Sequence, residues 1–167
     1  MPILPAVRDP RFITVRRGGT LSDSDHRLLA EWAAVCAEHV LPLFDDAIAD
    51  PRPRDAIELT RAWIRGEVPM KQAHSMAFTA NAAGRGLPDA ARFAALAAGQ
   101  AVAVAHVPAH ELGAAAYAIR SAVAAGGDRL RERDWQRDQL PAGIRALVLD
   151  DQALRSAICW NVFDDAD

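Results

Sequence analysis

The stretch from Leu87 to Ala125 is mostly alanine, and it constrains the fold more than any other part of the sequence. Alanine is the best helix former because it loses no rotamer freedom on folding and does not crowd the preceding turn. Small side chains also let helix axes approach closely, so helices of this kind are expected in the middle of a bundle. We therefore predict two buried central helices, from Pro88 to about Val107 and from Pro108 to about Ala125.

Apolar patterns elsewhere predict further helices around this pair. From Leu28 to Phe44 apolar side chains recur at spacings of three and four, which is the period of one helix face, and Ser22 or Ser24 can cap this helix. Pro42 lies inside the pattern and removes a backbone hydrogen bond, so we expect a kink or a restart there. The remaining helices are predicted over residues 53–65, 69–83, 128–139, 141–149 and 152–163.

Residues 1–20 carry no helical pattern. A short β-prone run, Phe12 to Val15, is followed by Arg16-Arg17-Gly18-Gly19, which is typical of a loop. A lone strand has no partner here, so we interpret residues 1–20 as an extended N-terminal arm packed on a single helical domain, residues 21–167. The predicted fold class is all-α: one compact multi-helix bundle of about six to eight helices with the alanine-rich pair at its centre.

Length and charge exclude several classes of protein. The 167 residues suit one domain, and the formal net charge of −3 argues against nucleic-acid binding, which usually needs a basic face. Gln100, His106 and His110 interrupt the nearest candidate for the about 18 apolar residues of a membrane span, and prolines and charges near the start do not suit a signal peptide. We expect a cytoplasmic protein that binds neither nucleic acid nor membrane, with Cys36 and Cys159 as buried free thiols.

The segment His106-Val107-Pro108-Ala109-His110-Glu111 holds the side chains best suited to chemistry. Two histidines four residues apart on a continuous helix would point the same way and form half of a zinc site. Pro108 lies between them, however, and Glu111 follows the second histidine, so the order differs from the HExxH zinc-protease motif. The segment therefore suggests metal binding without matching a known catalytic motif.

A metal site at His106, His110 and Glu111 would also need a ligand from another helix, and Glu38, His39 and His74 are the nearest kinds of candidate. The alternative, which we favour, is that the two histidines hydrogen-bond helix-terminal carbonyl groups at a tight turn inside the bundle. No nucleophile elbow or phosphate-binding loop occurs in the sequence. We accordingly predict no catalytic residue and no cofactor, with a zinc-binding or metal-dependent helical enzyme as the alternative function.

Three long segments of the chain resemble one family: DPRFITVRRGGTLSDSDHRLLAEWAAVCAEHVLPLF, RPRDAIELTRAWIRGE and AALAAGQAVAVAHVPAHELGAAAYAIRSA. They are similar to bacterial immunity proteins with an Imm-5-like domain, and AHVPAHELGAAAYA is the most specific part of the likeness. The resemblance implies an all-helical, non-catalytic protein that binds and neutralises a toxin. It carries no catalytic residues over to this sequence.

Two kinds of protein contact follow as hypotheses. Acidic side chains could face a basic toxin surface and speed its association. The alanine-rich face could instead form a homodimer. The acidic candidates are Asp45, Asp46, Asp50, Asp150, Asp151 and the tail Asp164-Asp165-Ala166-Asp167.

Overall fold

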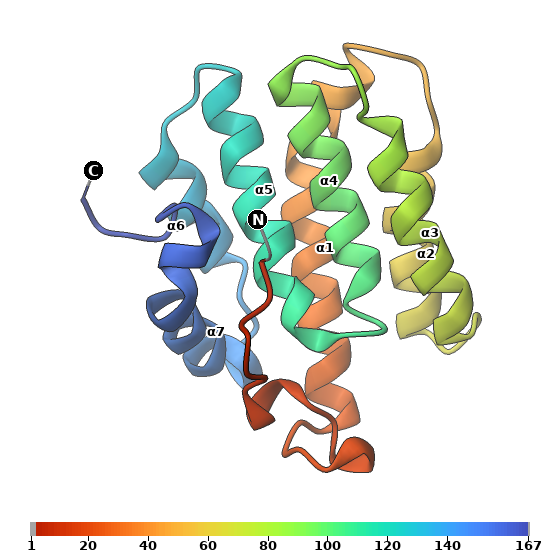
Figure 1. Cartoon of the computed structure of the whole chain (residues 1–167), viewed down its shortest axis with the longest axis vertical. Coiled ribbons are helices and arrows are strands. Elements are labelled where there is room, and N and C mark those ends of the chain that lie inside the picture. The colour runs from red at the N-terminus through yellow and green to blue at the C-terminus, as the bar shows by residue number, and fades with distance from the viewer. Residues whose placement is uncertain (1–2, 167) are drawn as a thin grey trace.

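The computed structural model describes residues 3–166, which fold into seven α-helices and contain no β-strand (Figure 1). The predicted all-α class is confirmed. Two helices lie in the middle of the molecule, two lie on one side of them and three on the other. In that order they are α1 (Asp23–Asp45) and α4 (Asp89–Ala103), then α2 (Arg52–Ile64) and α3 (Met70–Ala83), then α5 (Glu111–Ala124), α6 (Arg129–Asp138) and α7 (Ala142–Arg155).

The alanine-rich helices α4 and α5 pack against each other and are largely buried, as predicted, although α4 shares the middle of the molecule with α1 while α5 lies beside it. Helix α4 packs against α1, α2, α3 and α5, and most of its alanines are fully buried. Its approach to α3 is so close that a Cβ atom on Gly99 would lie 1.9 Å from Asn81 Oδ1 and 3.1 Å from the Ala77 carbonyl oxygen. Small residues therefore set the spacing of the core.

The two alanine-rich helices, α4 and α5, are shorter than predicted. Helix α4 ends at Ala103, and the short 3-10 helix η3 (Pro108–His110) precedes α5. Val107 is extended, with φ −132° and ψ 105°, because a residue before proline avoids the α region. Residues 104–107, which we predicted to be helical from the alanine content, form the turn between α4 and α5 instead.

Two other boundaries also differ from the predictions. Helix α1 begins after Ser22, whose hydroxyl accepts a hydrogen bond from Asp25 N as expected, but it continues through Pro42 to Asp45 without a restart. Helix α7 is continuous from Ala142 to Arg155, where two separate segments were predicted, because no proline or glycine follows Gly143 within it. The 3-10 helix η4 (Ser156–Cys159) follows directly.

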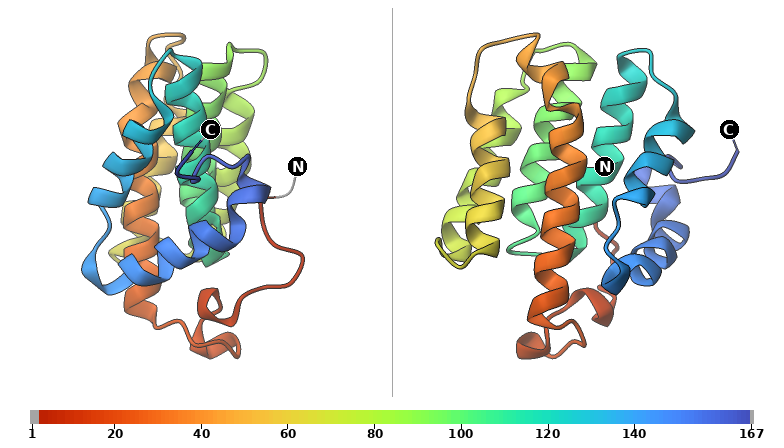
Figure 2. Two further views of the ribbon diagram at one scale, coloured as in Figure 1. Left: turned by 90° about the vertical axis from the view of Figure 1, so that its left-hand side faces the viewer. Right: turned by 180° about the vertical axis from the view of Figure 1, so that it is seen from behind.

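The N-terminal arm, residues 3–21, crosses the end of the bundle below α1 (Figure 2). It contains two short 3-10 helices, η1 (Pro10–Phe12) and η2 (Val15–Arg17), and an isolated β-bridge between Thr14 and Leu21. Phe12 is only 1% exposed, so the arm contributes a side chain to the core. None of the helices in the described residues is long and apolar enough to cross a membrane.

Candidate functional site

The three predicted site residues lie at the turn between α4 and α5, and each has different partners. The His106 ring stacks on His74 of α3 with 4.2 Å between ring centroids. His110 Nδ1 lies 2.7 Å from Gln100 Oε1, to which it donates. Glu111 is fully buried beside Arg155 of α7. The turn therefore separates the three side chains into three environments.

This arrangement gives no ready metal centre. Among residues 3–166 no group of three or more His, Cys, Asp or Glu side chains is placed to hold a metal ion. Of the further ligands considered, only His74 reaches His106, and the two stacked rings hold their nitrogen lone pairs in nearly parallel planes. Glu38 pairs with Arg61, and His39 pairs with Glu132. The zinc site stays a prediction that metal analysis of the purified protein would test.

A histidine does bind a helix-terminal carbonyl at this turn, but it is a different one. His26 of α1 is buried, and its Nε2 lies 2.7 Å from the Val104 carbonyl oxygen at the end of α4. Burial lowers the pKa of His26, and it lowers the pKa of His110 to about 4. Both rings are therefore neutral at physiological pH and serve as single-proton donors inside the bundle.

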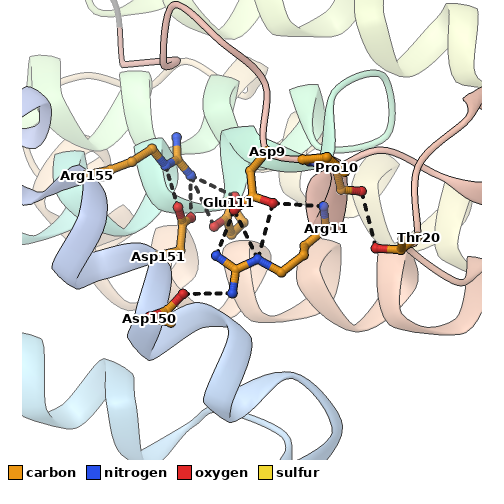
Figure 3. Close-up of polar contacts among 8 residues, drawn as sticks. All are labelled: Asp9, Pro10, Arg11, Thr20, Glu111, Asp150, Asp151 and Arg155. Atoms are coloured by element: carbon orange, nitrogen blue, oxygen red, sulfur yellow. Dashed lines mark hydrogen bonds and ion pairs between the residues drawn. The ribbon is translucent and has the colours of Figure 1, made fainter.

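Beneath the arm, Arg155 joins two buried carboxylates (Figure 3). Its guanidinium donates to both carboxylate oxygens of Asp151, at 2.7 and 2.6 Å, and lies 3.3 Å from Glu111 Oε1. It also donates to the carbonyl oxygens of Ala109, at 2.9 Å, and Ile3, at 3.2 Å. Burial and the neighbouring Asp151 raise the pKa of Glu111 well above its ordinary value, because a second negative charge beside Asp151 is unfavourable there.

A second arginine fastens the arm from outside. Arg11 pairs with Asp9 of the arm and with Asp150 of α7, both at 2.7 Å (Figure 3). Together with the bond from Arg155 to the Ile3 carbonyl, these contacts tie residues 3–11 to α5 and α7. The cluster is thus a structural connection between the arm and the bundle.

These pairings bear on the expected acidic toxin-binding surface, and they overturn it at one residue. Asp151 is 2% exposed and bonded to Arg155, so its prediction as a surface contact is wrong. Most of the other acidic candidates in the helical region are neutralised within the chain, because each has an arginine partner. These pairs are Asp45 with Arg54, Asp50 with Arg52, and Asp150 with Arg11.

Helix α3 presents a different kind of surface. Lys71 is the only charged residue in this helix and the only lysine in the chain. Ala73, Ala77 and Ala80 face the core, while Phe78 on the opposite side is 67% exposed. We call the exposed stripe at spacings of three and four the outer face of α3; it consists of Lys71, His74, Ser75, Phe78 and Thr79.

That outer face has the composition of a protein-binding surface. Interface cores are depleted in charged residues and enriched in aromatic ones, whereas an ordinary exposed helix face carries charges of both signs. Helix α3 packs mainly on α2 and α4, and the side that bears Phe78 is exposed. Sequence analysis missed Phe78, although the lack of acidic residues between Met70 and Ala83 was a readable signal.

A second missed feature is a basic cavity of about 330 Å³ between the arm and the bundle. Arg8, Arg16 and Arg17 of the arm line it, together with Trp63 and His106. The Arg16-Arg17-Gly18-Gly19 sequence predicted a loop, but only the path of the arm shows where those arginines lie.

Comparison with known proteins identifies a family. The family model described as "Imm-5 like putative immunity protein" matches residues 19–143, a span that includes α1 to α6 and the outer face of α3. Searches of curated proteins and of solved structures find no match. Because the family model covers well over half of the chain, the protein belongs to the Imm-5-like immunity protein family.

Proposed function

We propose that this protein binds a protein toxin and neutralises it without catalysing a reaction. Membership of an immunity protein family over residues 19–143 is the observation that carries the proposal. Such an inhibitor needs a rigid scaffold and one complementary surface. The closely packed helices around α4 supply the scaffold.

We place the toxin contact on the outer face of α3. Phe78 is an aromatic side chain that gains little from its own fold, since it is 67% exposed; its ring contacts that of His74, with 5.4 Å between ring centroids. Aromatic anchors surrounded by small polar side chains are typical of the residues that contribute most binding energy at interfaces. Ser75 and Thr79 flank Phe78 on this face, and Lys71 lies at its end.

A genetic selection tests the function. Cells would carry this chain under one promoter and an expression library of fragments of the source genome under another. We expect at least one fragment that stops growth only when the chain is absent, and whose product forms a complex with the chain of defined size. A library that covers the genome and contains no such fragment would contradict the proposal.

A pair of variants tests the face. Phe78→Asp should weaken toxin binding by about 2 kcal/mol or more, which is about 30-fold, because a charge replaces the aromatic anchor. Leu154→Asp is the matched control, since Leu154 is 66% exposed on α7. Titration calorimetry with the selected toxin would compare them. Equal affinity of the two variants would remove α3 from the interface.

Lys71, the only lysine, gives an independent test of whether the toxin covers the outer face of α3. Acetylation of Lys71, followed by peptide mapping, should slow when the toxin is bound, because the outer face of α3 is then covered. Light scattering of the free protein tests whether a second copy of the chain, instead of a toxin, covers this face. A dimer that Phe78→Asp converts to a monomer would assign the face to a second copy of the chain.

A further inference from the structure

The cavity between the arm and the bundle has two chemically different walls. The arm supplies Arg8, Arg16, Arg17 and the ring of Phe12, whereas the bundle supplies Trp63 and His106 among its lining residues. None of the described lining residues is a carboxylate. The cavity is therefore basic on one side and largely aromatic on the other.

Two of its arginines lack a partner within the described chain. Arg16 lies 3.0 Å from Asp23 Oδ1, so its charge is compensated. The guanidinium groups of Arg8 and Arg17 make no hydrogen bond or ion pair with any residue in the range 3–166, and Arg17 bonds only through its backbone N–H, to the Thr14 carbonyl oxygen. Arg11, Arg133 and Arg155 are each held by carboxylates, whereas the two guanidinium groups of Arg8 and Arg17 at this cavity are left without a counter-charge among the described residues.

The guanidinium charges of Arg8 and Arg17 both act on the ring of His106. Burial lowers the pKa of His106, and the neighbouring His74, Arg17 and Arg8 lower it further, so both guanidinium groups lie within electrostatic range of that ring. The ring of Trp63 contacts His26, with 4.8 Å between centroids, and His26 is itself bonded to Val104. His26 and Trp63 both line the cavity, so the indole adds an apolar surface beside the basic one.

We propose that this cavity binds a small phosphomonoester, with its phosphate on Arg8 and Arg17 and its organic group against Trp63. A phosphate monoester carries about −1.5 to −2 charges at pH 7 and offers three acceptor oxygens, which matches two guanidinium forks. A single carboxylate would leave one positive charge uncompensated. The volume of about 330 Å³ lies at the low end for ligand sites, so the organic group is compact.

The residues that test this site differ from those that test the toxin-binding proposal, because Arg8 and Arg17 belong to the arm and Phe78 to the outer face of α3. Loss of one activity therefore leaves the other measurable. The two places are neighbours, since His74 of that face stacks on His106 at the cavity. The purified full-length chain serves for both measurements.

Titration calorimetry with three probes tests the charge match. At low salt and pH 7.5 we expect phenyl phosphate to bind with one-to-one stoichiometry and at least tenfold more tightly than phenyl sulfate. Phenyl sulfate has the same ring but one negative charge fewer. Inorganic phosphate should also bind more weakly than phenyl phosphate, because it lacks the group that contacts Trp63. Absence of phenyl phosphate binding, or equal affinity for phenyl sulfate, would overturn the proposal.

Three variants locate the site. Arg8→Gln and Arg17→Gln should each weaken phenyl phosphate binding at least tenfold without lowering the melting temperature, because neither side chain has a partner to lose. Arg85→Gln, on the loop after α3, is the control for an exposed arginine elsewhere and should bind normally. Equal losses in all three variants would show non-specific attraction. A phosphoserine peptide that binds more tightly than phenyl phosphate would overturn the small-ligand assignment in favour of a phosphorylated protein segment.

Discussion

Replacing Arg155 with methionine should destabilise the protein strongly. The Arg155 side chain is 6% exposed and donates hydrogen bonds to Asp151, to Ala109 and to Ile3. Methionine fills much of the same space but leaves the Asp151 carboxylate buried without a cation. Removing one partner of a buried ion pair typically costs about 3–5 kcal/mol, because the other charge stays desolvated. We expect the free energy of unfolding to fall by about that amount.

Thermal unfolding followed by circular dichroism measures this loss. For a chain of this length each 1 kcal/mol lowers the melting temperature by about 2–4 °C, so Arg155→Met should lower it by about 6–20 °C. Trypsin should also cut faster after Arg8 and Arg11, since the arm loses its bond at Ile3. Arg145→Met is the control: Arg145 is exposed and donates to the Arg137 carbonyl oxygen, so we expect a loss below about 1 kcal/mol.

One result would refute this reasoning. If Arg155→Met and Arg145→Met unfold at the same temperature, the buried carboxylates do not need the guanidinium, and the cluster does not hold the arm. Urea unfolding at 25 °C would exclude an effect confined to high temperature.

Two further perturbations test the cluster and the core. The folded-state pKa of Glu111 is raised above its ordinary value of 4.5, so its contribution to stability is complete below pH 4.5 and is lost as pH rises through the raised pKa. Glu111→Gln cannot titrate, so urea unfolding between pH 4.5 and pH 8 should show a smaller loss of stability in the variant, and parallel curves would contradict the assignment. Gly99→Ala should cost about 1–3 kcal/mol by overpacking against Asn81 and Ala77. Gly143→Ala should change stability little, because its Cβ would meet the flexible end of Leu28, at 3.3 Å, and Asp25 Oδ1 at an ordinary 3.7 Å; equal melting temperatures for the two variants would show that α3 and α4 can separate.

Local sequence determined most of the helices. Alanine content predicted the central pair, and the cap at Ser22 predicted the start of α1. Local rules failed where tertiary packing decides. Pro42 does not end α1, and Asp150-Asp151 lie within α7, where one of these carboxylates pairs with Arg11 and the other with Arg155.

The candidate site was less predictable, because its contacts join distant parts of the chain. His26 binds the Val104 carbonyl across 78 positions, and Arg155 reaches Glu111 across 44. Nothing in the sequence around His106 indicates that His26 or Arg155 packs at this turn. The unpaired state of Arg8 and Arg17 likewise follows from the path of the arm, which no periodic pattern encodes.

The arm has a consequence for how such proteins diverge. Residues 3–18 lie outside the span matched by the family model, yet they supply every arginine that lines the basic cavity. Substitutions there change the charge and shape of one wall without altering any contact between the α-helices. A new ligand preference can therefore arise through changes in a short terminal segment, while selection on the helices continues to maintain the scaffold.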